Sequence, residues 1–227
     1  MTDTPDRDTA SDLAARRGLD TDVYPPSEDS ALLATAVVDR LTSKEVDRLT
    51  SEKVDRLTSE EADQFTSEDL VLEVGTGSGW IAARIVESTG ATVIGSDLNP
   101  HACRAAGERG IPVVRGNLLE PFADDRFDAV VFNPPYLPTD PDHEWDDWME
   151  AALSGGPDGR RLVTPFLAAL DRVLAPDGRG YLLVSSLTDR DAVEAIAADN
   201  GLEANAIAEE SYPFETLFVL ELTRAGV

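Results

Sequence analysis

The segment Asn133-Pro134-Pro135-Tyr136 combines residue types that could hold a planar NH2 group, and it follows a strand-like apolar run at residues 128–132. The Asn133 side-chain carbonyl and the Pro134 backbone carbonyl are hydrogen-bond acceptors, and the prolines keep the latter from pairing with a neighbouring N–H. Tyr136 can stack on a flat group. We therefore predict that these four residues bind an amide or an aromatic amine.

Such a nitrogen is a poor nucleophile because its lone pair is delocalised. A site that places both N–H groups against acceptors directs the lone pair toward an electrophile, so catalysis would depend on positioning and electrostatics without a strong general base. If a methyl donor binds upstream, the methyl group would be transferred here. The alternative interpretation is a proline turn that only closes a strand.

A glycine-rich turn lies upstream, where the apolar run at residues 70–74 leads into Gly75-Thr76-Gly77-Ser78-Gly79. Glycines let the backbone approach a nucleoside and turn sharply into a helix. The dinucleotide fingerprint needs a further glycine where Trp80 stands. Glu73 precedes the first glycine by two residues, and a carboxylate suits the cationic sulfonium and amino groups of S-adenosylmethionine. Ordinary turn glycines would produce the same loop, so this prediction depends on further residues.

Asp97 ends the second predicted strand, 22 residues after Gly75. On such folds an acid at this distance receives the ribose hydroxyls of a nucleoside, and a carboxylate can accept both protons. After the third predicted strand, Asn117 could bond the adenine edge and Leu118 could cover its face. With Asn133 in register, these residues predict nucleoside binding.

The elements that must position these residues alternate regularly from residue 70 onward. Strand-like runs at 70–74, 92–96, 111–114, 129–132 and 180–185 alternate with helix-like stretches at 80–88, 99–108, 159–174 and 189–199. A last pair of strands at 203–208 and 216–223, separated by Tyr212-Pro213, predicts an antiparallel edge hairpin. The sequence thus predicts an α/β fold: a doubly wound, seven-stranded, mostly parallel sheet. Ligands bind such sheets at the carboxyl ends of the strands.

The N-terminal part has a different organisation. Residues 1–20 are expected to be a disordered leader, and residues 21–227 one domain whose first helix is capped by Ser27. Residues 42–69 repeat with period eight, which would turn an apolar stripe by about 80° per repeat around a straight helix. Capping-box spacing such as Thr42 to Glu45 favours short helical turns with breaks. The repeat is interpreted as a surface insertion or, alternatively, as a partner-binding arm.

The composition is strongly acidic, with 44 Asp and Glu against 19 Lys and Arg, of which only Lys44 and Lys53 are lysines. This composition favours adaptation to a salt-rich cytoplasm over binding of a basic partner. It is only weak evidence against a nucleic-acid substrate. Cys103 is the only cysteine, so the chain has neither an internal disulfide nor a cysteine zinc site. With two histidines far apart, no metal is expected. Without an apolar run of about 18 residues or a secretory leader, a soluble, cytoplasmic protein is expected.

Six segments, VYPPSEDSALL, LEVGTGSGW, SDLNP, GNLLEPF, FNPPYLP and SGGPDGRR, occur in this order within residues 22–223. The set resembles the HemK-like protein glutamine methyltransferases, in the archaeal and eukaryotic branch that modifies class I release factors, here in a halophilic archaeal version. The resemblance implies a Rossmann-like class I methyltransferase that uses S-adenosylmethionine to N5-methylate the glutamine of a Gly-Gly-Gln motif. It also implies a small zinc-binding activator protein.

By matching position, the resemblance assigns the glutamine to Asn133, Pro134, Pro135 and Tyr136. It assigns the donor to Glu73, Gly75, Asp97, Asn117 and Asn133. Further donor contacts are predicted at Tyr24, Glu28, Thr76, Gly77, Gly79, Leu98 and Leu118. The family usually has aspartate where Asn117 stands, and Trp-Ala-Gly-Gly where Leu153-Ser154-Gly155-Gly156 stands. The first difference loses a charge beside adenine, and the second would alter the substrate groove.

The expected activator has a physical rationale, because strand 111–114 should lie at a sheet edge open to a partner strand. The main alternative activity is N6-methylation of adenine in DNA or RNA, which would need base flipping and a basic groove. Lysine methylation and a non-catalytic scaffold are further alternatives. The acidic stretch 140–150, with Trp145 and Trp148, would be a lid over the substrate or a solvated loop.

Overall fold

The structure, a computed structural model, describes residues 22–53, 69–139 and 148–226. The predicted leader at 1–20, the second part of the repeat at 54–68 and residues 140–147 of the acidic stretch lie outside this range. None of the described helices is long and apolar enough to cross a bilayer.

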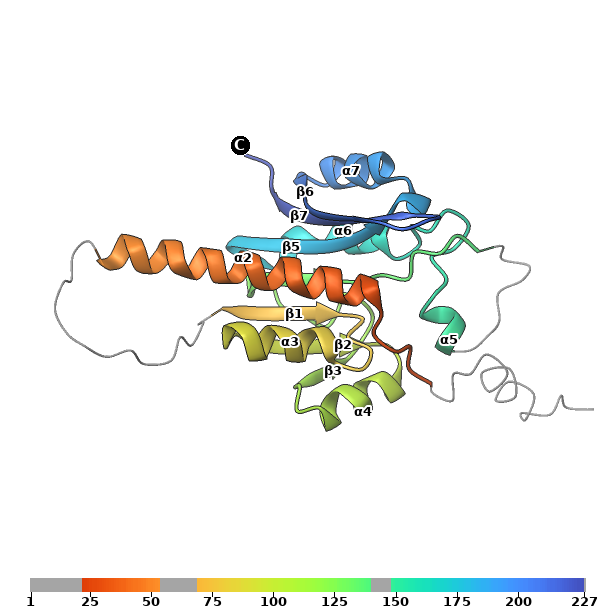
Figure 1. Cartoon of the computed structure of the whole chain (residues 1–227), viewed down its shortest axis with the longest axis horizontal. Helices are drawn as coiled ribbons and strands as arrows, with labels where there is room; N and C mark the ends of the chain where they lie inside the picture. Colours follow the sequence, from red (N-terminus) through yellow and green to blue (C-terminus); the bar gives the residue numbers. More distant parts are fainter. Residues whose placement is uncertain (1–21, 54–68, 140–147, 227) are drawn as a thin grey trace, which may run out of the picture.

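The described residues form one sheet of seven strands in the order β3-β2-β1-β4-β5-β7-β6. Neighbours from β3 to β5 are parallel, and β7 pairs antiparallel with both β5 and β6. This confirms the predicted α/β architecture with an antiparallel edge pair (Figure 1). The strands are β1 Leu70–Val74, β2 Thr92–Asp97, β3 Val113–Arg115, β4 Phe127–Phe132, β5 Leu174–Ser185, β6 Leu202–Ser211 and β7 Thr216–Arg224.

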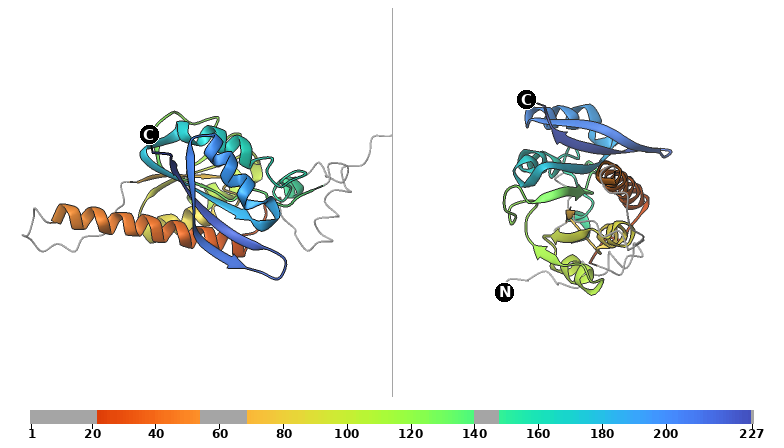
Figure 2. Two further views of the ribbon diagram at one scale, coloured as in Figure 1. Left: turned by 90° about the horizontal axis from the view of Figure 1, so that it is seen from above. Right: turned by 90° about the vertical axis from the view of Figure 1, so that its left-hand side faces the viewer.

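Helices cover both faces of the sheet. Viewed along the strands, α2 and α3 lie on one side (Figure 2, right), where their apolar residues and Ala106 of α4 share one buried cluster. Helices α6 and α7 contribute to a second cluster on the opposite face. The helices are α2 Glu28–Lys53, α3 Trp80–Thr89, α4 Pro100–Glu108, α5 Trp148–Ala151, α6 Val163–Val173, the 3-10 turn η2 Ser186–Thr188 and α7 Arg190–Asp199.

Helix α2 corrects the prediction for the repeat. It runs without a break from Glu28 to Lys53, so residues 42–53 continue the helix, and Thr42 does not start a new one. The segment contains neither glycine nor proline, and the Ser43 hydroxyl bonds back to the Asp39 carbonyl at 2.7 Å, which satisfies it inside the helix. Leu41 is the last buried apolar residue described in α2. The predicted breaks were therefore wrong for this part of the repeat.

Strand β5 is also longer than predicted, because it begins at Leu174 instead of Gly180. Leu174 pairs with Phe127, and a register shift follows before the regular ladder with β4 resumes at Ala129. Because of this irregular register, the first half of β5 lacks the alternation of apolar and polar residues by which a strand is predicted from sequence. Helix α6 is correspondingly shorter than the predicted stretch and begins at Val163.

The sheet reverses its winding between β1 and β4. These strands pair in parallel up to Val74 and Phe132, so their carboxyl ends lie side by side although the crossovers from them run in opposite directions. Such a reversal opens a crevice between the loops. The glycine turn follows β1 and Asn133 follows β4, so both lie at this crevice.

Candidate active site

A cavity of about 540 Å³ lies at the carboxyl ends of β1, β2 and β4. It brings together residues that are distant in sequence, from the segment before α2 to the loop between β6 and β7. The sequence predicted fifteen site residues, and all but two of them line this cavity. The lining residues that the sequence predicted are Tyr24, Glu73, Gly75, Thr76, Gly77, Asp97, Leu98, Asn117, Leu118, Asn133, Pro134, Pro135 and Tyr136.

The glycine turn is held against the end of β2. Gly75 and Gly77 adopt φ values of 63° and 53°, a left-handed conformation that glycine enters without a steric penalty. The Thr76 N–H donates to the Ser96 carbonyl at 2.9 Å, and the Gly77 N–H donates to Asp97 Oδ2 at 2.9 Å. The donor loop and the predicted ribose acid are thus one hydrogen-bonded unit.

Gly79 has a different role from the one predicted, because it does not line the cavity. It precedes α3 with a φ of 74°, and a Cβ added there would lie 2.9 Å from the Ala106 Cβ of α4. The absent side chain lets the start of α3 approach α4. Gly79 therefore serves the close packing for which the dinucleotide fingerprint uses a glycine one position later.

The Asp97 carboxylate accepts two backbone N–H groups, from Gly77 on Oδ2 and from Asn99 on Oδ1, each at 2.9 Å. Burial raises the pKa of Asp97 above its usual value, and these hydrogen bonds oppose that shift. Each carboxylate oxygen keeps a second lone pair. The geometry therefore leaves Asp97 able to receive a pair of ribose hydroxyls.

Glu73 is almost completely buried under the same loop. Its Oε2 accepts the Thr76 hydroxyl at 2.5 Å and the Ala82 N–H of α3 at 3.0 Å. Burial raises the pKa of Glu73 to about 8, against the effect of both hydrogen bonds. The side chain thus ties β1 to the glycine turn and to α3, while its predicted pairing with a cationic donor stays a prediction.

The loop after β3 presents the predicted adenine contacts. The Asn117 amide donates Nδ2–H to Glu120 Oε1 at 2.7 Å, which leaves Oδ1 as the end that can accept from an exocyclic amine. Leu118 beside it has a φ of 45°, a costly conformation for a branched residue, and it lines the cavity. Leu98 lies at the rim with half of its surface exposed.

The segment before α2 forms one wall of the cavity through Val23, Tyr24 and the two prolines that follow. It is fastened to the start of α4, because Asn99 Nδ2 donates to the Asp22 carbonyl at 2.8 Å and His101 Nδ1 lies 3.3 Å from Asp22 Oδ2. Glu28, a predicted donor contact, is exposed and does not line the cavity. Each helical residue is turned by about 100° from the last, so Asp29 and Ser30 face inward instead.

The acceptor segment forms another part of the wall, beside the start of α2. Asn133 Nδ2 lies 3.5 Å from Ser30 Oγ, whereas Asn133 Oδ1 is buried without a hydrogen-bond partner among the described residues. Burial raises the pKa of Tyr136, and the nearby acids Asp29 and Glu215 raise it further. Tyr136 is therefore a neutral phenol suited to stacking and not to acting as a base.

The glycine loop at residues 155–159 supports the acceptor segment. The Leu137 N–H donates to the Leu153 carbonyl at 3.1 Å, and the Gly155 N–H donates to the Leu137 carbonyl at 2.9 Å. A Cβ at Gly159 would lie 2.5 Å from the Tyr136 carbonyl oxygen. Close backbone approach thus requires a glycine here. Leu153 also lines the cavity, and it is the first residue of the run that differs from the family that the sequence resembles.

Several lining residues escaped the sequence analysis. Ser96 Oγ is buried at the cavity without a hydrogen-bond partner among the described residues. Its place at the end of β2, one residue before Asp97, was a signal that could have identified it. Ser30, Arg161 and Glu215 are brought to the cavity by helix packing and loop closure, for which the sequence has no local signal.

Comparisons with known proteins identify relatives of this chain. Residues 71–154 match the family model described as a methyltransferase domain. A putative protein N5-glutamine methyltransferase of Methanocaldococcus jannaschii is 30% identical over 209 residues, which are 89% of this chain and 92% of that protein. The methyltransferase HEMK2 of Homo sapiens is 28% identical over 222 residues, which are 92% of this chain and 93% of that protein.

Among solved structures, the E. cuniculi Mtq2–Trm112 complex, responsible for methylation of the termination factor eRF1, has a chain that is 26% identical to this one. It superposes with a TM-score of 0.65 and covers 90% of this chain and all of its own length. The similarity thus extends over nine tenths of this chain.

Family and fold imply S-adenosylmethionine as the methyl donor, and the residues present fit it. Asp97 offers carboxylate oxygens for ribose, Asn117 offers an amide oxygen for adenine, and the buried Asn133 Oδ1 and Ser96 Oγ require polar partners that a ligand would supply. When bound, this group supplies the electrophilic methyl, and the protein supplies orientation. The chain is a methyltransferase and belongs to the HemK-like protein N5-glutamine methyltransferases of the archaeal and eukaryotic branch.

Proposed function

We propose that this enzyme transfers a methyl group from S-adenosylmethionine to the side-chain nitrogen of the glutamine in the Gly-Gly-Gln motif of a translation release factor. Its relatives support this substrate, because the E. cuniculi chain acts on eRF1 and a Schizosaccharomyces pombe relative is an eRF1 methyltransferase catalytic subunit. The donor side of the cavity is formed at β1 and β2, and the acceptor side at β4.

The observation that carries the proposal is the unpartnered Asn133 Oδ1, which is buried where the cavity meets the end of β4. A buried amide oxygen without a partner is costly, so a bound N–H donor would be favoured there. A glutamine amide carries two N–H donors and a flat surface for Tyr136. Bound in this way, its nitrogen needs no base that removes a proton before methyl transfer.

The enzyme acts, under this proposal, together with a small zinc-binding activator of the Trm112 type. Support comes from the Trm112 subunit in the E. cuniculi complex and from the exposed edge of β3. Pro112 and Gly116 use their backbone groups toward β2, since Gly95 N–H donates to the Pro112 carbonyl and Gly116 N–H to the Asp97 carbonyl. Successive residues of a strand direct their backbone groups to opposite sides, so the N–H and C=O groups of Val113 and Arg115 point away from β2, where a partner strand could pair.

Mass spectrometry of two potential substrates tests the reaction. A release factor with an intact Gly-Gly-Gln loop and a DNA oligonucleotide are each incubated with S-adenosylmethionine and the co-expressed complex. We expect one methyl group on the glutamine and none on DNA. Methylation of DNA alone would support the adenine alternative and refute the proposal.

Asn133→Ala is the companion variant. It should lower glutamine methylation by on the order of 10²-fold or more, because it removes an acceptor aligned with the reacting nitrogen. Circular dichroism and the unfolding midpoint show whether the fold is retained. A folded variant that methylates glutamine at the parent rate would show that the acceptor site is misassigned.

A further inference from the structure

Ser30, in the first turn of α2, lies between the acceptor asparagine and a carboxylate. Its Oγ is 3.5 Å from Asn133 Nδ2 and 3.2 Å from Asp29 Oδ1, and the residue is only 9% exposed. Asn133 and Ser30 are 103 residues apart in the chain and meet because α2 packs beside the carboxyl ends of the strands. Neither hydroxyl contact is expected from the sequence.

The direction of these hydrogen bonds follows from the chemistry of the three groups. The Asp29 carboxylate is an acceptor only, and its Oδ1 also receives the Ser27 hydroxyl at 2.6 Å and the Ser30 N–H at 2.5 Å. Ser30 has one hydroxyl proton, which it donates to Asp29. Ser30 Oγ can then only accept from Asn133, so the NH2 end of that amide must face Ser30.

The opposite end of the amide faces the cavity as a consequence. Asn133 Oδ1 is the buried atom that has no hydrogen-bond partner among the described residues. Rotation of the amide by 180° would place its oxygen against Ser30 and its NH2 in the cavity. The NH2 would then oppose the N–H groups of an amide substrate, and donor would meet donor.

We propose that Ser30 is a positioning residue that fixes the amide orientation of Asn133 and thereby selects an acceptor side chain with N–H groups over one with a carboxylate. This inference rests on the proposed function, since it explains how a glutamine is distinguished from a glutamate of the same shape. Ser30 acts through Asn133 and does not itself touch the reacting nitrogen. Asp29 orients Ser30 in turn.

The test compares Ser30→Ala with Ser30→Thr, which keeps a hydroxyl, and with Ser27→Ala. Ser27 is the matched control because its exposed hydroxyl donates to the same Asp29 oxygen without contacting Asn133. Each variant complex is assayed for glutamine methylation of the release factor. We expect kcat/KM to fall about tenfold in Ser30→Ala, to be largely restored in Ser30→Thr, and to change less than about twofold in Ser27→Ala.

A second readout separates orientation from simple loss of structure. The release factor with Gly-Gly-Glu in place of Gly-Gly-Gln is used as a competitive inhibitor of each variant. The parent enzyme should bind it weakly, because a carboxylate would face the Asn133 oxygen. Ser30→Ala frees the amide to rotate and should bind it several-fold more tightly, while affinity for S-adenosylmethionine stays within about twofold.

Unchanged preference for Gln over Glu in a folded Ser30→Ala variant would overturn the inference, as would equal losses in Ser30→Ala and Ser27→Ala. These outcomes differ from failure of the proposed function. In that case the parent complex would not methylate the release factor at all.

Discussion

The Gly77 backbone N–H donates to Asp97 Oδ2 at 2.9 Å, so this hydrogen bond fixes the turn after β1 against the carboxylate at the end of β2. The residue that we propose binds the ribose of the donor also holds the glycine turn beside it. Substitutions at Asp97 should therefore lower donor affinity in two ways, by loss of the ribose contact and by release of the loop.

Asp97→Asn is expected to be nearly as damaging as Asp97→Ala, although asparagine is isosteric. The carboxylate accepts N–H groups on both oxygens, and an asparagine NH2 would oppose one of them. Calorimetric titration with S-adenosylmethionine should show affinity at least about tenfold lower for both variants. Asp199→Asn, an exposed change at the end of α7, is the control. Full affinity in Asp97→Asn would contradict this role.

Glu73 predicts a specific pH dependence of stability. Its folded-state pKa of about 8 lies above the ordinary value of 4.5, so between these pH values the folded chain binds more protons than the unfolded one. The free energy of unfolding should then fall as pH rises from about 4.5 to about 8, with this contribution fully lost above pH 8. Glu73→Gln keeps an acceptor for Thr76 and Ala82 but cannot ionise.

Urea unfolding of parent and Glu73→Gln at several pH values measures this contribution. The difference between them should grow in favour of the variant as pH rises, by up to a few kcal/mol. Parallel stability curves would show that Glu73 does not retain its proton in the folded state.

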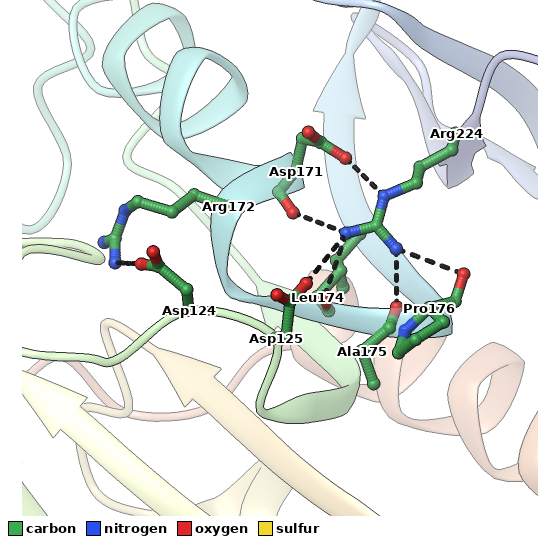
Figure 3. A network of polar contacts seen from close by, with 8 residues as sticks. All are labelled: Asp124, Asp125, Asp171, Arg172, Leu174, Ala175, Pro176 and Arg224. Carbon is green, nitrogen blue, oxygen red and sulfur yellow. Dashed lines mark hydrogen bonds and ion pairs between the residues drawn. The ribbon is translucent and has the colours of Figure 1, made fainter.

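Arg224, near the end of β7, fastens the edge hairpin to the junction of α6 and β5 (Figure 3). Its Nη atoms donate to the carbonyls of Asp171, Leu174, Ala175 and Pro176 at 2.7 to 3.1 Å, and its Nε donates to the Asp171 carboxylate at 2.5 Å. Two of these carbonyls, those of Asp171 and of the C-cap residue Leu174, are among the last four of α6, which have no partner within the helix. Arg224 therefore acts as a cap for a helix to which it is not adjacent in sequence.

Arg224→Ala should lower the free energy of unfolding by about 1–3 kcal/mol, with catalysis by the folded enzyme unchanged. The loss should persist in molar salt, because most of the bonds go to neutral carbonyls and only the exposed ion pairs are screened. Arg84→Ala is the control, since the one ion pair of Arg84 among the described residues is a loose, exposed pair with Glu87 at 3.8 Å. A loss that disappears in salt would assign the effect to the ion pairs instead.

The edge of β3 provides a test of the activator proposal. Val113→Pro removes an N–H that points away from β2, so it should prevent augmentation by a partner strand while leaving the internal ladder intact. Co-purification with a Trm112-type subunit should be lost in Val113→Pro and retained in Val113→Ala. The chain expressed alone should be poorly soluble, and a monodisperse, fully active monomer would refute the need for a partner.

Local signals in the sequence were sufficient for most of the fold. Glycines after an apolar run and polar residues after three further runs predicted a parallel sheet with its ligands at one edge, and the described strands agree. These features are local because strand periodicity, proline and glycine act through the backbone of their own segment. Boundaries were missed where register or helix continuity depended on a neighbour, as at Leu174 and Thr42.

The sequence by itself predicted which groups would hold the reactants: Asn133 to Tyr136 for the acceptor, and the glycine turn with Asp97 for the donor. These predicted residues line one cavity, apart from Gly79 in the turn. Only the tertiary structure decided how those groups are directed. It brought Ser30 to Asn133, separated Glu28 and Gly79 from the cavity, and buried Glu73 under the loop. The reason is physical: residue type sets what an atom can donate or accept, whereas its orientation depends on partners that packing brings from distant parts of the chain.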